Sequence, residues 1–562
     1  MNNKSKKTLL VTLSIIIISV FTTAYISRNE SKDFKLQKNL DIFYSLVREL
    51  NAFYVDEIKP DELIKESIDE MLNDLDPYTT YYPESESDDF AFMTTGKYGG
   101  IGSLIRKNGD YTVLTQIYKG FPADLAGLKA GDKLKKINGE SLKGLAADQV
   151  SEKLKGEANT EMNLLIGRQG RDIEKTLTRK RVTIPPVPYY GMIDNETGYI
   201  RFTNFTQNCS QDVKQALVDL LEKKGAQKII LDLRSNPGGL LGEAVEIVNF
   251  FVGPGHEVVS TKGRVKRFDN TYKTSRQAID EDVPLVVMIN RSTASAAEIV
   301  AGAIQDLDRG VVVGQRSYGK GLVQISRPLS YKATLKVTTA KYYIPSGRCI
   351  QALDFSNRNE DGSVGHIPDS LVSEYKTLNG RIVKDGGGIS PDHEAVPDRL
   401  SQFTSELYVR SLIFDFATDF YWDNPEIAGP GEYRLSDDTF RDFAAFLEER
   451  DFNYTSASQD ALERLTRVAQ SEKYYKRNEE LLKELEKSLD HDLQDDLELY
   501  RDEVTRLLED EIIGRYYYEE GLLKHSLWSD KQVNKALDII KNQSLYSSTL
   551  KGTEGLLSRN NQ

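Results

Sequence analysis

Residues 283–327 read VPLVVMINRSTASAAEIVAGAIQDLDRGVVVGQRSYGKGLVQISR, and this stretch decides the fold around it. An apolar, β-branched run at 283–289 is followed by a Ser/Thr loop, a helix of small residues that begins near Ser295, and a second β-run at 311–313. This alternation places Ser295 at a strand-to-helix junction and Lys320 on a Gly-Lys-Gly turn after the next strand. The pattern suggests the hypothesis that Ser295 is a nucleophile and Lys320 its base.

Each of these two residues also has a plain structural interpretation. Ser295-Ala-Ala-Glu298 fits the S-x-x-E capping box, so Ser295 taken alone is better explained as the N-cap of the helix. Gly314 to Lys320 fits G-x-x-x-x-G-K, the opening of a phosphate-binding P-loop. However, Gly321 stands where that motif needs Ser or Thr, and the strand-like LVQI after it offers no helix N-terminus to a phosphate. The P-loop interpretation therefore fails on both counts.

An activated serine needs a base, and a lysine can replace the usual histidine. No histidine lies near a plausible strand-to-helix junction, and the sequence contains no G-x-S-x-G. A lysine amine has an ordinary pKa of ~10.4, and burial among apolar residues lowers that pKa enough for the amine to act as a base. Glycines on both sides let the Lys320 backbone approach the serine, and Tyr318, Leu322 and Val323 supply apolar neighbours.

The segment upstream continues the α/β pattern and ends in a glycine turn. Residues 198–231 contain a strand, an amphipathic helix and a buried strand, and the segment Ser235-Asn-Pro-Gly238-Gly239 follows. A glycine pair at such a turn leaves backbone amides free above the strand ends, where a developing negative charge can be stabilised. Taken alone, the glycines are more simply explained by the geometry of the turn.

Residues 97–183 change to short strands and turns, with an Asn138-Gly139 hairpin signal. The run A-x-x-A-G-L-x-x-G-D-x-[IL]-x-x-I-N-G, met from Ala123 to Gly139, resembles a PDZ domain. The resemblance implies a site that captures a C-terminal carboxylate with backbone N–H groups and pairs the peptide as an added strand. It assigns the carboxylate-binding loop to Tyr98, Gly99, Gly100, Ile101 and Gly102, where glycines let consecutive amides face one anion.

Composition argues against several classes of protein. The 562 residues exceed a single core and predict three or more units. The 73 Lys and Arg against 86 Asp and Glu give a formal charge of −13, which argues against a nucleic-acid partner. The two cysteines, Cys209 and Cys349, lack CxxC spacing and leave at most one disulfide open, and the five histidines include no HxxxH pair. We therefore expect neither a metal nor another cofactor.

The N-terminal segment predicts attachment to a membrane. Lys4, Lys6 and Lys7 precede an almost uncharged apolar run of about 19 residues at 8–26, long for a signal peptide and close to the ~20 residues that span a bilayer. No A-x-A cleavage site follows. We expect an uncleaved anchor in the inner membrane and a protein body in the cell envelope or periplasm. The close alternative is a cleaved signal and a secreted protein.

Three motifs together look like the carboxy-terminal processing proteases, the tail-specific serine peptidases. The spacing of 25 residues from Ser295 to Lys320, and of four from Lys320 to Gln324, fits the family pattern. The resemblance extends over roughly residues 35–395. The motifs are Asp232-Leu-Arg-x-Asn-Pro-Gly-Gly239, Ser292-Thr-Ala-Ser-Ala-Ala-Glu298 and Gly314-x-x-x-Tyr-Gly-Lys-Gly-x-Val-Gln324.

The resemblance implies a Ser–Lys peptidase core with an inserted PDZ domain, acting on protein substrates with unstructured C-terminal tails. It makes Ser295 the nucleophile, Lys320 the general base and Gln324 the residue that orients the lysine. The oxyanion hole would consist of the backbone amides of Ala296 and of Gly238 or Gly239. The alternative from another class is an inactive PDZ scaffold that binds protein C-termini, although no part of the catalytic motifs is missing.

The whole chain is therefore expected to be an α/β (α+β) multi-domain protein with a mixed-sheet core. Beyond residue 398 the helical patterns, including an aromatic helix at 403–420 and a charge-laced stretch at 474–508, resemble no family that we recognise. They predict a solvated helical appendage or a docking arm. Residues 34–92 resemble regions that pair subunits in relatives. Self-association into a homo-oligomer, or binding of an adaptor protein, is therefore a further expectation. The expected divisions are 1–33 anchor, 34–92 helical arm, 93–183 PDZ domain, 184–397 protease core and 398–562 helical extension.

Overall fold

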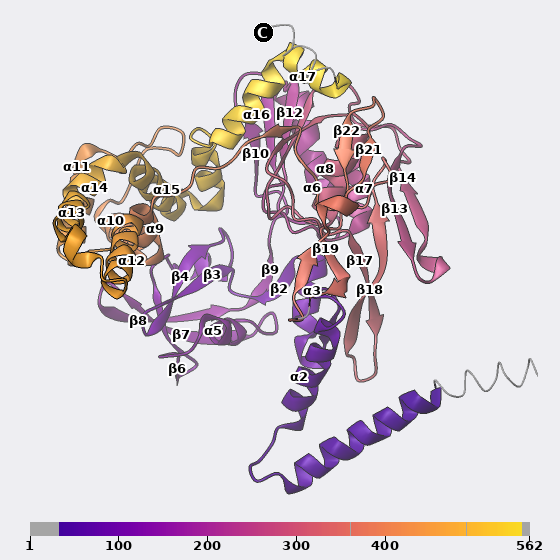
Figure 1. Cartoon of the computed structure of the whole chain (residues 1–562), viewed down its shortest axis with the longest axis horizontal. Coiled ribbons are helices and arrows are strands. Elements are labelled where there is room, and N and C mark those ends of the chain that lie inside the picture. Colours follow the sequence, from indigo (N-terminus) through magenta and orange to yellow (C-terminus); the bar gives the residue numbers. More distant parts are fainter. Residues whose placement is uncertain (1–32, 360, 491, 553–562) are drawn as a thin grey trace, which may run out of the picture. The chain divides into compact units, whose positions relative to one another are not determined.

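The computed structural model describes residues 33–359, 361–490 and 492–552 (Figure 1). They form two compact units: one ends at Tyr81 and includes Leu335–Val337, and the other holds Tyr82–Thr334 and the chain from Thr338 onward. The anchor predicted at 1–33 lies outside the described residues, apart from its last position. Within the described ranges, no helix combines the length and the apolar character that crossing a membrane requires.

The first unit is helical. Residues 33–53 form one helix, α2 (Pro60–Asn73) forms another, and β1 (Thr80–Tyr82) begins at the end of the unit. Proline opens α2, where its fixed φ suits the first helical position. Asp61 and Glu62 follow in the first turn, near the positive end of the helix dipole.

The predicted PDZ segment is an antiparallel sheet with two short helices, in the second unit. α5 (Ala147–Leu154) buries Val150 and Leu154 at helical spacing against the sheet, and α4 (Pro122–Leu125) buries Ala123. β3 lies at one edge of the sheet and is near α5. β2 (Lys97–Gly100) and β9 (Lys180–Thr183) pair beside this sheet. The strand order is β3 (Ser103–Asn108), β4 (Tyr111–Ile117), β5 (Lys133–Ile137), β7 (Glu161–Arg168) and β8 (Arg171–Thr178), with β6 (Glu140–Ser141) beside β5.

The protease segment contains a six-stranded sheet whose strands are parallel except for β10. Its apolar runs are nearly continuous because helices cover both faces, and alternate residues point to opposite sides. The strand order is β10 (Tyr189–Met192), β11 (Thr197–Arg201), β12 (Lys228–Asp232), β15 (Leu285–Ile289), β16 (Val311–Gly314) and β23 (His393–Glu394).

One face of this sheet carries the helices of the expected core. Leu231, Leu285 and Val287 point toward this face and share a buried cluster with residues of α6 (Cys209–Val218), α7 (Leu241–Asn249) and α8 (Ala296–Asp306). Burying each such aliphatic side chain contributes about 1.5–3 kcal/mol. α8 is buried along its whole length, which explains its small residues.

The other face is covered by the last two described helices, α16 (Lys531–Lys541) and α17 (Gln543–Lys551). Ile230, Val286, Met288, Val311 and Val313 of the sheet pack there with Val533, Ala536, Ile539 and Ile540 of α16. The hydroxyl of Tyr546 donates to the Leu285 carbonyl (3.1 Å) and accepts from the Leu285 amide (2.9 Å). The end of the predicted helical appendage is thus an integral layer of the protease core.

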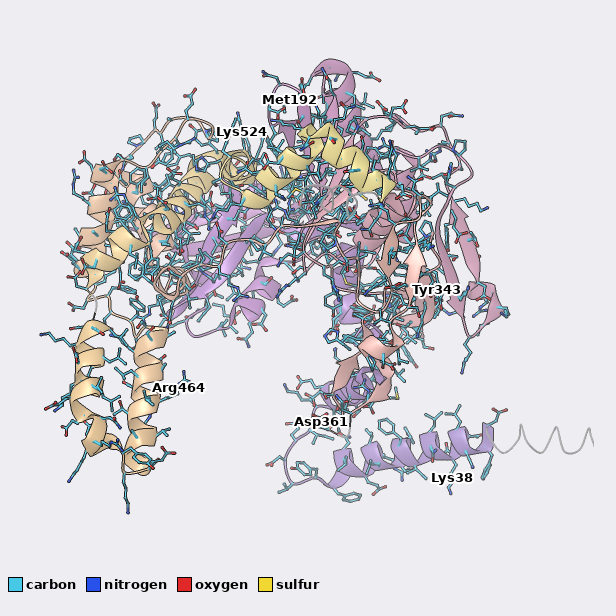
Figure 2. All side chains as sticks on the ribbon, turned by 45° about the horizontal axis from the view of Figure 1, so that its top comes forward. Lys38, Met192, Tyr343, Asp361, Arg464 and Lys524 are labelled. Atoms are coloured by element: carbon cyan, nitrogen blue, oxygen red, sulfur yellow. The ribbon has the colours of Figure 1, made fainter. Side chains whose placement is uncertain are left out.

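The rest of the C-terminal region has an apolar core of its own, built around Phe403, Phe416 and Phe443. The helix predicted over 403–420 is divided in two, because Ser411, the N-cap of the second helix, has a φ of 64° that a continuous helix does not allow. Arg464, on α12, is labelled in Figure 2. The helices are α9 (Gln402–Val409), α10 (Leu412–Asp423), α11 (Asp437–Glu448), α12 (Ala457–Ser471), α13 (Tyr475–Ser488), α14 (Leu493–Leu499) and α15 (Arg501–Ser526).

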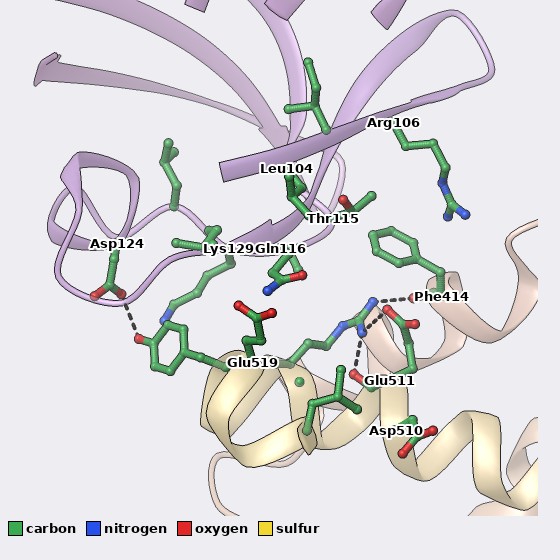
Figure 3. A pocket seen from close by; sticks show the side chains of 18 of the residues that line it. Leu104, Arg106, Thr115, Gln116, Asp124, Lys129, Phe414, Asp510, Glu511 and Glu519 are labelled. Atoms are coloured by element: carbon green, nitrogen blue, oxygen red, sulfur yellow. Dashed lines mark hydrogen bonds and ion pairs between the residues drawn. The ribbon is translucent and has the colours of Figure 1, made fainter. Parts of the chain in front are cut away.

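The helical region contacts the PDZ sheet around a cavity of about 470 Å³ (Figure 3). The Tyr518 hydroxyl donates to Asp124 (2.7 Å), and α15 is kinked at Tyr518, whose φ is 57°. The Arg106 guanidinium lies 5.1 Å from the ring centroid of Phe414. A methyl group on Gly131 would come within 2.4 Å of Thr418. The two regions are therefore in direct contact.

A second sheet and several hairpins complete the protease segment. β13 (Glu257–Gly263) pairs antiparallel with β14 (Asn270–Lys273) and with the end of β18 (Thr334–Tyr343). α3 (Ser87–Thr95) precedes the PDZ segment. Cys209 and Cys349 are both free, so the disulfide that the sequence left open does not form. The remaining strands are β17 (Leu322–Pro328), β19 (Leu353–Arg358), β20 (Val364–His366), β21 (Glu374–Lys376) and β22 (Ile382–Lys384).

Candidate active site

Ser295 lies where the chain leaves β15 and enters α8, as the sequence predicted. Its backbone has φ 57° and ψ −118°, a conformation that costs a residue other than glycine of order 1–3 kcal/mol and is concentrated at functional sites. Its hydroxyl makes no capping hydrogen bond to the helix. Ser295 is thus the N-cap of α8 and its amide is bound by Glu298, as in the predicted capping box, but its hydroxyl takes no part in the cap.

Glu298 connects the segment that carries Ser295 to the turn that carries Lys320. Its Oε2 atom accepts hydrogen bonds from the backbone amides of Ser295 (2.8 Å) and Lys320 (2.9 Å). Its Oε1 atom accepts from the Gly319 amide (2.7 Å) and the Ser317 hydroxyl (2.5 Å). One carboxylate thus brings together the backbones of Ser295 and Lys320.

The Glu298 side chain is fully buried, and this burial raises its pKa to about 7. The hydrogen bonds from Ser317, Lys320, Gly319 and Ser295 act in the opposite direction, because they stabilise the ionised carboxylate. From the sequence, Glu298 fits an acidic position of the Ser292–Glu298 motif, but the capping box explains it equally well. Its contact with Lys320 depends on a loop 22 residues further along the chain, which no local pattern reveals.

Lys320 is on the turn before β17, between Gly319 with a φ of 86° and Gly321. A methyl group on Gly321 would lie 2.7 Å from the backbone nitrogen of Gln351, so glycine is needed there for close packing. Gln324 is on β17, and its side-chain amide donates to the Thr338 hydroxyl (3.1 Å). The assignment of Gln324 as the residue that orients the lysine stays a prediction.

The glycine turn after β12 lies against Ser295. A methyl group on Gly238 would come within 2.7 Å of the Ser295 β-carbon and 2.8 Å of the Ala296 nitrogen. The Gly238 amide donates to the side chain of Asn236 (2.9 Å) and is therefore occupied. In the described part of the chain, no acceptor pairs with the amides of Gly239 and Ala296. Of the three predicted oxyanion donors, these two are the ones with an available N–H.

A buried ion-pair network supports the same turn. Asp232 is fully buried and accepts a bond from the Tyr199 hydroxyl (2.6 Å), and it pairs with Arg201 (2.9 Å) and Arg234 (2.6 Å). Burial would raise the pKa of Asp232, but the two guanidinium groups hold it well below its ordinary value. Arg234 also contacts Asp530, at the start of α16 (2.7 Å). The sequence contained this motif, but its partner at residue 530 could not be inferred.

The predicted carboxylate loop is divided between a strand and a turn. Tyr98, Gly99 and Gly100 are in β2 and pair with β9, and Ile101 and Gly102 form the turn into β3. Gly102 has a φ of 76°, and a methyl group there would be 2.4 Å from the Phe121 β-carbon. The Tyr98 ring covers Gly100, since a methyl group on Gly100 would lie 2.6 Å from it. Carboxylate binding by this loop stays a prediction.

A parallel sheet with a strained serine above its strand ends, joined to an embedded PDZ domain, defines the class of PDZ-containing serine peptidases. Three protein-family models match the chain. They are peptidase family S41 over residues 196–356, a PDZ domain over 113–168, and "Probable PDZ-protease, C-terminal helical domain" over 403–540. The third match gives the C-terminal region a counterpart that sequence analysis did not recognise.

The chain is also similar to known proteins of this class. The chain is 33% identical over 379 residues to a "Probable CtpA-like serine protease" of Staphylococcus aureus, an alignment that covers 66% of this chain and 72% of that protein. It is 32% identical over 366 residues to a carboxy-terminal-processing protease of Bartonella bacilliformis, covering 64% and 80%. A solved photosystem II D1 C-terminal processing protease is 27% identical, with a TM-score of 0.36 and coverage of 63% and 92%. The chain belongs to the carboxy-terminal-processing serine peptidases of family S41.

Proposed function

We propose that this protein is an extracytoplasmic endopeptidase that binds the unstructured C-terminal tail of a protein substrate through its PDZ domain and cleaves it by a Ser–Lys mechanism. The observation that carries the proposal is the bond of one buried carboxylate, Glu298, to the amides of both Ser295 and Lys320. Nucleophilic catalysis requires that serine and base be held together in this way.

In this mechanism the neutral amine of Lys320 takes the proton of the Ser295 hydroxyl while the oxygen attacks the scissile carbonyl. The tetrahedral oxyanion is stabilised by the amides of Gly239 and Ala296, each such donor typically contributing about 3 kcal/mol in the transition state. Lys320 then gives its proton to the leaving amine, and the C–N bond breaks to leave an acyl ester on Ser295. Water attacks the ester with Lys320 again as the base, and Ser295 regains its proton.

Tail capture would use the edge strand β3 of the PDZ sheet. An extended peptide adds to such an edge through backbone hydrogen bonds, while its terminal carboxylate meets backbone amides at the turn that precedes the strand. The position of β3 at the edge, the nearness of α5 and the turn at Ile101 and Gly102 support this role. The family membership supports it as well.

We also propose that residues 8–26 anchor the protein to the inner membrane, with the body in the cell envelope. This rests on the length and apolar character of the segment and its basic flank. Cell fractionation of the full chain and of a chain lacking residues 8–26 tests it. The full chain is expected in the membrane pellet and the deletion variant is not, and equal distribution would contradict the anchor.

The catalytic proposal is tested with a protein substrate that carries an unstructured C-terminal tail. Ser295→Ala and Lys320→Ala should abolish cleavage while leaving thermal unfolding close to that of the parent chain. Calorimetry on Ser295→Ala should detect binding of a tail peptide with a free carboxylate and much weaker binding of its C-terminal amide. Full activity in either variant would refute the mechanism, and equal affinity for both peptides would refute carboxylate recognition.

A further inference from the structure

The hydroxyl of Tyr342 contacts the same two residues as Glu298, but through their carbonyls. It donates to the backbone oxygen of Ser295 (3.1 Å) and forms a second, shorter hydrogen bond with the backbone oxygen of Lys320. A phenol has one proton, so this is a shared, three-centre hydrogen bond. Glu298 binds the two N–H groups and Tyr342 binds the two C=O groups.

The position of Tyr342 is itself fixed by the surrounding sheet. It is on β18, where it pairs with Thr261 of β13, and its backbone amide donates to the Gly321 carbonyl (3.0 Å). The side chain is almost completely buried. Because a buried phenol oriented in this way has little freedom, its oxygen is a fixed point against which Ser295 and Lys320 are positioned.

Both residues that Tyr342 contacts need an external restraint. Lys320 is flanked by Gly319 and Gly321, which leave the turn more conformational freedom than other residues would. Ser295 has a φ of 57° in a region that residues other than glycine avoid, and such a conformation persists only when its surroundings impose it. Hydrogen bonds to both sides of each residue supply that restraint.

We propose that Tyr342 is a positioning residue, whose hydroxyl holds the backbones of Ser295 and Lys320 at the separation that proton transfer between their side chains requires. The inference rests on the Ser295–Lys320 mechanism proposed above and adds a residue to it. The Tyr342 hydroxyl binds the backbone oxygens of Ser295 and Lys320, and we assign it no part in the proton transfer itself. Its effect is confined to the geometry of the pair.

The test replaces Tyr342 by phenylalanine, which removes one oxygen and keeps the ring. Tyr343→Phe is the matched control, since Tyr343, labelled in Figure 2, is the next residue of β18. Its side chain points to the other side of the strand and lies near Lys262. On a tailed substrate, kcat of Tyr342→Phe should fall on the order of 10- to 100-fold, with KM changed less than about twofold, because misplacement affects the chemical step. Tyr343→Phe should keep both constants.

A second measurement does not depend on turnover. In the Ser295→Ala background, adding Tyr342→Phe should accelerate amide hydrogen exchange over residues 318–324, and adding Tyr343→Phe should not. Equal kcat in the two phenylalanine variants, unchanged exchange, or failure of Tyr342→Phe to fold would each overturn the proposal, the last by showing a general structural role. If Ser295→Ala or Lys320→Ala kept full activity, the proposed mechanism would fail instead, so the two failures are distinguishable.

Discussion

The buried carboxylate of Glu298 lies 2.9 Å from the backbone nitrogen of Lys320, a residue on a different element of the core. The same oxygen also accepts the Ser295 amide, so the carboxylate links the start of α8 to the turn before β17. All four groups around it donate hydrogen bonds. A side-chain group that only donates hydrogen bonds therefore cannot replace the Glu298 carboxylate.

Glu298→Gln should therefore inactivate the protein although it changes little in size. The new –NH₂ group must face either the amides of Ser295 and Lys320 or the Gly319 amide and Ser317 hydroxyl, so it leaves a buried donor opposite another donor. We expect kcat/KM on a tailed substrate to fall on the order of 100-fold. Glu503→Gln is the control, because Glu503 accepts a backbone amide from Ser401 far from the site. Similar kinetics in both variants would contradict this role of Glu298.

The raised pKa of Glu298 predicts how stability depends on pH. The pKa in the folded protein is about 7, above the ordinary value of 4.5, so the fold favours the protonated group. That contribution is fully present below about pH 4.5 and is lost as the pH rises through about 7, on the order of 3 kcal/mol. Urea unfolding of Ser295→Ala should therefore lose more stability between pH 5 and about 8 than that of Ser295→Ala/Glu298→Gln. Parallel pH dependence in the two would exclude a titrating Glu298.

A methyl group at Gly238 should disrupt the site without unfolding the core. Gly238→Ala would place that carbon 2.7 Å from the Ser295 β-carbon, at a φ of 93° that alanine disfavours. We expect kcat to fall on the order of 100-fold or more, since small displacements of a nucleophile are this costly. Gly242→Ala, four residues on, is the control, because nothing lies within 4 Å of the added carbon. Wild-type activity in Gly238→Ala would rule out this contact.

Tail binding should depend on the shape of the turn before β3. Gly102→Ala would put a methyl group 2.4 Å from the Phe121 β-carbon and should weaken binding of a free-carboxylate peptide on the order of tenfold or more in calorimetry. Gly109→Ala has a comparable positive φ but open space around the added carbon. It therefore controls for backbone strain alone and should bind the peptide as the parent does. An equal loss of peptide affinity in Gly102→Ala and Gly109→Ala would show that backbone strain causes the effect.

The packing of α16 on the sheet should be essential for stability. Ile540 is almost fully buried against the sheet, so Ile540→Ala should lower the free energy of unfolding by about 2–5 kcal/mol, measured in urea. Leu485→Ala is the control, because Leu485 on α13 is 42% exposed. A loss below about 1 kcal/mol at Ile540 would show that α16 is dispensable for the core.

The sequence predicted the layers of the protease core from particular runs. The β-branched segments at 228–232, 285–289 and 311–314 became neighbouring parallel strands, and Ser295 came out at the predicted junction. These features could be predicted because they follow from residue patterns within short segments of the sequence. The PDZ segment was identified from its turn residues for the same reason, since Gly102 and Gly139 both have the positive φ that such turns require.

Other features depend on contacts between distant residues and could not be inferred. Glu298 had a sufficient local explanation as a cap, and nothing in the sequence indicated that its carboxylate reaches Lys320. The charged pattern of residues 474–508 indicated a solvated region. It gave no sign that α16, further along the chain, buries Val533 and Ile539 against the sheet. The occupied amide of Gly238 depends on how Asn236 turns its side chain.

The position of α16 and α17 also has a consequence for how the protein is made. Domains generally begin to fold as the chain emerges from the ribosome, N-terminal parts first. Here the strands that carry Val286, Met288 and Val311 are synthesised more than 200 residues before the helices that cover them. The sheet beneath Ser295 therefore stays open on one side until α16 and α17 have been synthesised. A chain that stops before α16 leaves the apolar side chains on this face of the sheet without their cover.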